Sequence, residues 1–236
     1  MNFLSQVANY LTSGANWSGS SSIPALLGNQ LEISALAVAA AVLTGVGLGA
    51  ALAQSNRGSF AVLNAANAAR AVPSFALITL LGIQPAIVRF RQGALVATLI
   101  AMFALAVPPV LTNAYVGVRD VDPAVSGAAL AMGMKRLQLF WKVEMPLAMP
   151  IIMAGARTAA VEVVATATLG AYVGYSDLGT YIFTGLALHD NVETFAGALL
   201  VALLALAVDT VMATSARALT PAGLRVARQA RPAAEQ

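Results

Sequence analysis

The sequence predicts an all-α polytopic membrane protein with about five transmembrane helices in one domain. Of its 236 residues, 59% are hydrophobic and 10% are charged, whereas about 25% of the residues in a soluble domain are charged. The mean hydropathy of the chain is +0.78. Apolar runs of about 20 residues are long enough to cross a bilayer as helices. The chain has room for about five such runs with short connections.

The five expected spans lie at about 31–53, 60–83, 94–117, 147–173 and 195–216. In the first of them, the spacing of Gly45 and Gly49 permits close approach by another helix, so we expect these glycines to serve packing. The second span contains Arg70 and Pro73. A proline breaks or kinks a helix, and a charge inside a membrane must face protein or water. We therefore expect a broken or re-entrant helix at 60–83.

The remaining segments divide the chain into an N-terminal part, 1–28, a permease domain, 29–219, and a basic tail, 220–236. The N-terminal part is polar, and we expect it to be loose or interfacial and to lie outside the cell. The connector 174–194 carries His189, Asp190 and Glu193, and we expect these three residues to form a solvated outer loop that meets a binding protein. A proton relay through His189, Asp190 and Glu193 is the alternative.

The basic residues set the orientation, because Lys and Arg gather on the cytoplasmic side of membrane proteins. One side of the five-span arrangement collects nine of them: Arg57, Arg119, Lys135, Arg136, Lys142, Arg217, Arg225, Arg228 and Arg231. The opposite loops hold Arg89 and Arg91. The asymmetry predicts a multi-pass protein of the bacterial plasma (inner) membrane with its N-terminus outside and its C-terminus in the cytoplasm.

Composition also limits the chemistry. The chain has no Cys and one His, so a thiolate or His-rich metal site is not expected. Its net charge is only +3, with the basic residues in short loops, so topology explains them better than nucleic-acid binding does.

A charged, amphipathic segment at 118–146 stands out between the third and fourth spans. Asp122 and Pro123 form a helix start, with an N-cap and a proline at the first helical position. Gly133 then separates this short helix from a second one that contains Trp141. Such a knob is suited to docking a soluble partner. The alternative is an amphipathic helix that lies on lipid, with Trp141 and Lys142 as anchors.

The spacing in this segment resembles the cytoplasmic loop of ABC importer permeases. That loop has Glu-Ala-Ala, three residues, Gly, nine residues and Ile-x-Leu-Pro. This chain keeps the spacing with Gly127, Ala128, Ala129, Gly133, Val143, Glu144, Met145 and Pro146, and Lys135 and Arg136 lie between. It departs from the family at Gly127, where the acidic residue is missing, and this departure removes one contact and predicts altered coupling in this half of a transporter.

The flanking sequence is similar to permeases for glycine betaine, choline, carnitine and proline betaine. The matching stretches are Pro108 to Ala124, Ala154 to Ala159, and Ala165 to Leu169. The resemblance covers about residues 30–224. It implies the MetI-like fold of type I ABC importers, a loop that couples to separate ATPase subunits, a second permease subunit that is identical or related, and an extracytoplasmic substrate-binding protein.

The chain itself shows no phosphate-binding loop of the G-x-x-x-x-G-K-[ST] kind, and both lysines, Lys135 and Lys142, follow residues other than Gly. We therefore expect no catalytic residue and no bound cofactor, and expect ATP and Mg²⁺ to act on the partner ATPase. Aromatic residues, which attract quaternary ammonium groups, make up only 6% of the chain. Tight substrate recognition is thus expected on the binding protein.

Polar residues within the spans are candidates for the translocation pathway. They are Asn113, Tyr115, Arg157, Glu162, Thr166 and Thr168. Arg157 and Glu162 are five residues apart and do not stack on each other, so each could instead form a structural ion pair with Arg70 or Asp209. The threonines could line a polar path or donate to carbonyls of their own helix.

Two other functions remain open from the sequence. A permease of the same fold could carry another small solute, such as methionine. An ion-coupled secondary transporter could use Arg157, Glu162 and Asp209, although such proteins usually contain internal repeats, and no convincing repeat is visible here.

Overall fold

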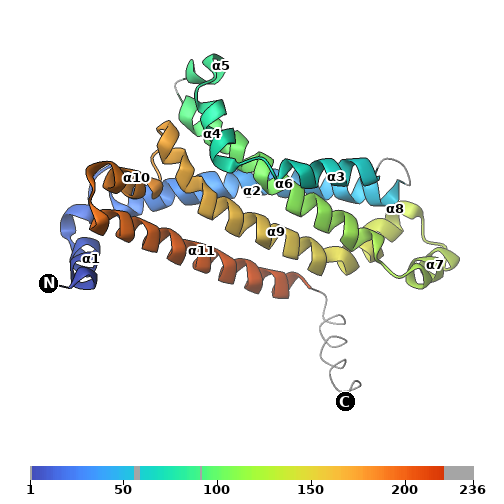
Figure 1. The fold of residues 1–236 in the computed structure, drawn as a ribbon. Helices are drawn as coiled ribbons and strands as arrows, with labels where there is room; N and C mark the ends of the chain where they lie inside the picture. The colour runs from blue at the N-terminus through green and yellow to red at the C-terminus, as the bar shows by residue number, and fades with distance from the viewer. Residues whose placement is uncertain (1, 56–58, 91, 221–236) are drawn as a thin grey trace.

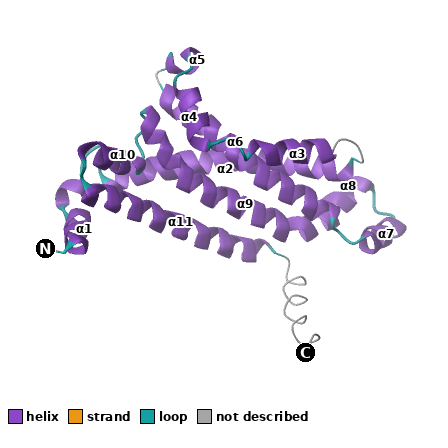
Figure 2. Ribbon diagram, viewed as in Figure 1, coloured by secondary structure: helices purple, strands orange, loops and turns teal. Residues whose placement is uncertain are grey.

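The computed structural model describes residues 2–55, 59–90 and 92–220. Several residues used in the sequence argument lie outside this part: Arg57, Arg91, Arg225, Arg228 and Arg231. Within the described residues every regular element is a helix, and no strand occurs (Figure 2).

Four long helices run lengthwise beside one another and form the body of the protein (Figure 1). They are α2 (Ile23–Gln54), α6 (Gly93–Arg119), α9 (Met145–Ala167) and α11 (Asn191–Leu219). Figure 1 places the short helices α1 (Phe3–Thr12) and α10 (Gly179–Leu188) at one end of this body and α7 (Pro123–Ala131) at the other. By length and hydropathy, α2, α6 and α11 could each cross a membrane, and so could the continuous helical segment Arg136–Val173 that contains α9.

The helices α2, α6 and α9 form the core because small residues let them approach closely. On α2, Gly45 and Gly49 are buried against α6, and a Cβ on Gly49 would lie 2.6 Å from the Leu111 carbonyl oxygen and 2.8 Å from the Ala114 Cβ. The intervening Gly47 has no atom within 4 Å of such a Cβ. The packing role expected from the sequence for Gly45 and Gly49 is therefore confirmed.

The second expected span is broken at Pro73, as its sequence predicts. It consists of α3 (Ser59–Ala69) and α4 (Ser74–Gly82), whose axes differ by 79°. Pro73 is the N-cap of α4 and has an extended backbone conformation, so α4 turns away and, with α5 (Pro85–Val88), projects from the body (Figure 1). The described part of the chain thus has four spans, or five if the bent pair counts as one.

Two segments are more ordered than the sequence suggests. The N-terminal segment, expected to be loose or interfacial, is not loose: it contains α1 and the 3₁₀ helix η1 (Gly14–Trp17) and packs on α11. The Phe3 and Phe195 rings lie 5.4 Å apart, which anchors it there. The connector 174–194 contains the apolar helix α10 packed on α11, whereas His189 and Asp190, expected in a solvated loop, are exposed in the turn between the two helices. Tertiary contacts of aromatic and apolar side chains order both segments.

The fourth span is longer than expected. The short helix α8 (Arg136–Leu139), a π-helical turn, η2 (Phe140–Glu144), α9 and the 3₁₀ helix η3 (Thr168–Val173) follow one another without a break. Helical structure therefore begins at Arg136, inside the segment expected as the coupling loop, and the loop boundary at residue 146 stays a prediction. Pro146 does not interrupt the helix, because proline is tolerated in the first turn of a helix and stands there in α9.

Candidate functional site

The candidate coupling segment is the protruding helix α7 and the turn that follows it. Asp122 begins α7, and its Oδ1 accepts a hydrogen bond of 2.8 Å from the Ala124 backbone N–H. The helix ends at Ala131, and in the turn that follows Gly133 has a φ of +87° and its N–H donates to the Leu130 carbonyl at 2.9 Å. The cap and the glycine turn expected from the sequence are both present, and they fix the direction in which α7 leaves the body.

Little of the chain covers α7. Its main tertiary contact within the described residues is with α8, and Ala129 is its buried residue. The apolar side chains of Val125 and Met132 are 42% and 75% exposed. An exposed apolar surface on a capped helix marks an interaction site. The geometry thus suits docking to another molecule.

The two glycines of this segment have different structural roles. Gly133 has a positive φ that an L side chain rarely adopts. Gly127 lies within α7, and a Cβ there would have no atom within 4 Å. The chain's own packing therefore does not require glycine at 127, and a longer side chain at this position would point into free space.

The remaining residues of the sequence pattern fall in helical structure. Lys135 is the N-cap of α8, and its backbone N–H donates to the Gln138 Oε1 at 3.0 Å. Arg136 begins α8, whereas Val143 and Glu144 lie in the π turn. Met145 and Pro146 begin α9. The loop motif is therefore joined directly to a membrane-spanning helix.

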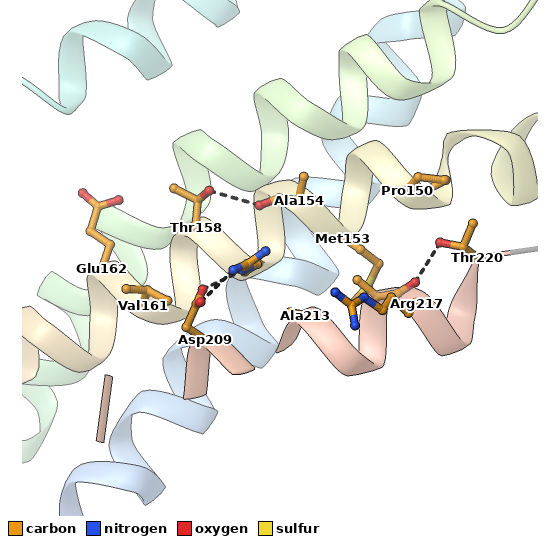
Figure 3. A pocket seen from close by; sticks show the side chains of 12 residues that line it. Pro150, Met153, Ala154, Thr158, Val161, Glu162, Asp209, Ala213, Arg217 and Thr220 are labelled. Carbon is orange, nitrogen blue, oxygen red and sulfur yellow. Dashed lines mark hydrogen bonds and ion pairs between the residues drawn. The ribbon is translucent and has the colours of Figure 1, made fainter. Parts of the chain in front are cut away.

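A second group of candidate residues forms a charged surface along α9. The Arg157 Nε and Nη2 donate to Asp209 Oδ1 and Oδ2 of α11, each at 2.6 Å (Figure 3). The Arg70 Nη2 lies 3.7 Å from the Glu162 Oε2. Both pairs match the structural ion-pair alternative. Their side chains remain between 32% and 45% exposed, and charges at membrane depth face water or protein rather than lipid.

This surface is hollowed between α9 and α11 into a groove of about 720 Å³. Arg157, Glu162, Asp209 and Arg217 supply charged side chains to its lining. In Figure 3, the Asp209 and Arg217 side chains belong to α11 and lie on its side toward α9, the helix that carries Glu162. The groove combines charges of both signs with apolar walls, so it can accommodate a water-filled path or the surface of another subunit.

The other expected pathway residues have local structural roles. Thr166 and Thr168 donate to carbonyls of their own helix, at 2.6 Å to Glu162 and 2.9 Å to Ala165. The Asn113 Nδ2 donates to the Pro109 carbonyl at 2.8 Å. The Tyr115 ring centroid lies 6.0 Å from the Arg119 guanidinium carbon. These four residues do not line the groove between α9 and α11.

A polar cluster at the α1–α10 end was missed by the sequence argument. The Gln30 side chain of α2 is buried, donates to the Val164 carbonyl at 2.8 Å and accepts from the Leu178 N–H at 3.0 Å. The neighbouring Asn29 donates to the Ser176 carbonyl at 2.9 Å. These bonds tie the η3–α10 connection to α2 and α9. The available signal was a group of polar residues, Asn29, Gln30 and Glu32, where an apolar span begins.

Asp177 lies in the same connection and is buried. Its Oδ1 accepts a 2.7 Å hydrogen bond from the Gly179 N–H, whereas its Oδ2 is buried without a hydrogen-bond partner. Burial raises the pKa of Asp177 to about 8, against the lowering effect of the Gly179 N–H. The carboxyl group is therefore largely protonated near neutral pH.

Comparison with known proteins identifies the class of this membrane protein. Residues 41–222 match the family described as binding-protein-dependent transport system inner membrane component. The chain belongs to this family of transport permeases. The family is made of transport subunits in the membrane, which agrees with the exposed α7 and the membrane-spanning body.

Several curated relatives of this permease are named as permeases for osmoprotectants. It is 36% identical over 202 residues to the glycine betaine/carnitine/choline transport system permease protein OpuCB of Bacillus subtilis, covering 84% of this chain and 88% of the relative. It is 35% identical over 200 residues to the choline transport system permease protein OpuBB of the same organism, covering 83% and 88%. The resemblance to this group of permeases is thus confirmed.

A solved structure agrees on the fold. The permease superposes on a chain of the inward-facing MetNI methionine ABC transporter with a TM-score of 0.71 and 19% identity, covering 82% of this chain and 94% of that one. The expected type I, MetI-like fold is confirmed.

Proposed function

We propose that this permease is the membrane subunit of an ATP-driven importer for osmoprotectants, with quaternary ammonium compounds such as glycine betaine or choline as substrates. The observation that carries the proposal is the exposed, capped helix α7, which the turn at Gly133 joins to α8 and so to a membrane-spanning helix, in a chain whose relatives are named as permeases for these compounds. Methionine remains the alternative substrate class.

In this proposal, α7 and the turn at Gly133 dock on a separate ATPase subunit, which binds and hydrolyses ATP with Mg²⁺. One chain supplies half of the pathway, and a second copy or a related permease supplies the other half across the charged surface of α9. An extracytoplasmic binding protein delivers the substrate to the α1–α10 end. Closure of the paired ATPases opens the permeases outward, and hydrolysis returns them inward.

The test is reconstitution with candidate ATPase and binding-protein partners in proteoliposomes, followed by uptake of labelled glycine betaine, choline or methionine. We expect uptake of a quaternary ammonium compound that needs ATP on the ATPase side and the binding protein on the other. Uptake driven by an ion gradient without ATP would contradict the proposal. Uptake of methionine alone would reject the substrate assignment and retain the transporter class.

The docking step has its own test, co-purification of the ATPase with variants of α7. Deletion must be confined to residues 123–134, because a longer deletion would remove α8 and the start of the fourth span. We expect this deletion to abolish co-purification while the chain still inserts in the membrane. Gly133→Ala should weaken co-purification through a strained turn, and Gly28→Ala, which adds a Cβ in free space outside the docking segment, is its control. ATPase retained by the deletion variant would disprove docking through α7.

A further inference from the structure

Three aromatic side chains from separate elements meet near the α10 end of the protein, and the proposed function does not use them. They are Phe75 of α4, Tyr172 of η3 and Phe183 of α10. The Phe75 and Tyr172 ring centroids lie 4.8 Å apart, and the Tyr172 and Phe183 centroids lie 5.8 Å apart. Tyr172 is thus the central ring of this cluster, which we call the aromatic trio.

The packing of the three elements holds the trio in place. Helices α4 and α10 both contact η3, and α10 also packs on α11. A Cβ on Gly82 of α4 would lie 2.6 Å from the Val173 Cγ1 of η3, so the two elements are in close contact beside the rings. The fold therefore positions the three rings before any ligand binds, which lowers the entropy that a ligand must overcome.

The rings of the trio are tilted toward one another. Their planes differ by 58° for the first pair and 54° for the second. The aromatic pairs next to α1, Phe3 with Phe195 and Tyr10 with Tyr181, differ by 74° and 87° and are edge to face, so an edge covers a face. A tilted pair leaves part of each face open, and a group placed in the angle between the rings contacts both faces.

Two of the three rings are accessible from outside the protein. Phe75 is 44% exposed and Tyr172 is 54% exposed. The hydroxyl groups of Tyr175 and Tyr181 donate to backbone carbonyls in and just before α2, at 2.9 Å and 2.8 Å, and so join the connector to that helix. The Tyr172 hydroxyl forms no hydrogen bond within the described residues. Its side chain is therefore not needed for the hydrogen bonds that close this end.

The charges of the elements that carry the trio favour a cation. Between Arg157 and Arg217 the sequence has no Lys or Arg, and α4 has no charged residue. Asp190 begins α11 as its N-cap, and Glu193 lies in the first turn of that helix. The face of an aromatic ring attracts a cation within about 6 Å of its centroid. No basic side chain of these elements repels a cation that approaches the rings.

We propose that the aromatic trio is a receiving site for the quaternary ammonium group of the substrate, at the end where the binding protein releases it. The proposal rests on the proposed function, from which it takes the substrate class. Exposed cation–π contacts are weak, and a site on a transport path must bind strongly enough to admit a ligand and weakly enough to release it. The trio therefore complements the tight recognition expected on the binding protein.

The test places a single tryptophan in the trio as a fluorescent reporter. Tyr172→Trp is combined with Trp17→Phe and Trp141→Phe, which remove the two native tryptophans. The full-length permease with its ATPase is studied in bilayers without choline lipids, and the binding protein is omitted because it would bind the ligand itself. Fluorescence is titrated with choline and with the neutral alcohol in which carbon replaces the choline nitrogen. We expect a saturable change with choline alone, because the ring faces attract only the cation.

Removal of a neighbouring ring measures its share of the binding. Phe75→Leu in the reporter protein should raise the half-saturating choline concentration about two- to fivefold, since an exposed cation–π contact contributes about 0.5–1 kcal/mol. Phe195→Leu is the matched control, because Phe195 is 42% exposed and belongs to an aromatic pair outside the trio. It should leave the half-saturating concentration unchanged. If Tyr172→Trp does not fold, Phe183→Trp places the reporter on another ring of the trio.

Two results of the titration would overturn the proposal. Equal responses to choline and to the neutral alcohol would show that the rings recognise apolar shape alone. No response to either would assign the rings to the membrane boundary, where aromatic side chains also gather. Uptake by the complete importer separates these results from the proposed function. Choline uptake without a response in the trio rejects only the receiving site, whereas uptake of methionine alone rejects both proposals.

Discussion

At the residue scale, the ion pair between Arg157 and Asp209 joins two spanning helices. Its bidentate geometry, with two contacts of 2.6 Å, orients both side chains within a groove that the rest of the transporter must cover or fill with water. Removing one partner leaves a charge at membrane depth without its counter-ion, which is more unfavourable than removing both.

We therefore predict coupling between these two positions. Arg157→Ala and Asp209→Ala should each reduce transport, and the double variant should lose less than the two single losses combined. Transport rates normalised to protein in the membrane measure this coupling, and Thr158→Ala, on the same turn, serves as a control. Strictly additive losses would show that the pair does not act as a unit.

Asp177 gives a pH-dependent prediction at the same scale. Its pKa of about 8 in the folded protein lies above the ordinary carboxyl value, so between about pH 4 and 8 the folded state binds more protons than the unfolded state. Stability from this group is present at low pH and is lost as the pH rises through 8. The loss is at most about 1.4 kcal/mol per pH unit.

Asp177→Asn should remove this dependence while keeping the acceptor for the Gly179 N–H. We expect the variant and the parent to have similar Tm values at about pH 4, where the carboxyl is protonated in both states, and the variant to be more stable at about pH 8.5. Thermal unfolding in detergent across this range is the measurement, with Glu32→Gln, an exposed carboxyl on α2, as control. If the difference in Tm between the parent protein and Asp177→Asn were the same at every pH, the raised pKa of Asp177 would be contradicted.

At the element scale, the contact between α2 and α6 depends on the glycines that face it. Gly49 admits no Cβ without movement of the α6 backbone, whereas Gly47, two residues earlier on the same helix, has open space. Gly47 and Gly49 lie in the same helix and in similar sequence context. Substitutions at the two positions therefore distinguish the effect of packing on stability from the effect of helix propensity.

We predict that Gly49→Ala destabilises the protein by about 1–3 kcal/mol, the usual consequence of overpacking. Gly47→Ala should be neutral or stabilising by up to ~1 kcal/mol, because alanine is the better helix former. Comparison of the two Tm values measures the difference. Equal values would mean that α2 can shift away from α6 without loss.

The elements also show which features sequence patterns can predict. The long apolar helices, the break at Pro73 and the Asp122 cap follow from composition and local chemistry, and all are present. The sequence did not reveal that α8 runs into α9 through a π turn, where Phe140 and Met145 pack against a buried cluster drawn from α2, α6 and α9, since no local pattern contains such contacts. Helices α1 and α10 escaped notice since their order comes from contacts with α11.

The candidate site was predictable to different degrees. Spacing alone located α7 and Gly133, since local chemistry defines both. For Arg157 and Glu162, the sequence allowed several ion-pair partners and selected none of them, because pairing depends on how α3, α9 and α11 are arranged. The two hydrogen bonds of the Gln30 side chain join it to Val164 and Leu178, which are 134 and 148 positions away in the sequence. No local sequence pattern contains that information.

At the scale of the whole molecule, the two ends of the helical body are expected to face opposite compartments. α10 lies at one end and α7 at the other (Figure 1). The chain has no native Cys, so single cysteines can report the exposure of each end without background.

We predict that Thr184→Cys on α10 reacts with a membrane-impermeant maleimide added to intact cells. Ser126→Cys on α7 should react only after the membrane is permeabilised. Both residues lie on short helices outside the long spans, and labelling is read by a mass shift of the purified protein. Labelling of Ser126→Cys in intact cells would reverse the proposed orientation.

The unbroken helical segment from Arg136 to Val173 has a consequence for how movement is transmitted through the molecule. Its 38 residues would span roughly 57 Å as an ideal helix, at about 1.5 Å per residue, which exceeds the ~30 Å hydrocarbon thickness of a bilayer. A helix resists compression along its axis, so a push at Arg136 reaches the Gln30 contacts near the far end as a displacement of similar size. The segment can therefore carry an axial displacement from the coupling end toward the Gln30 contacts, and the π turn and Pro150 are the two irregular points along this path.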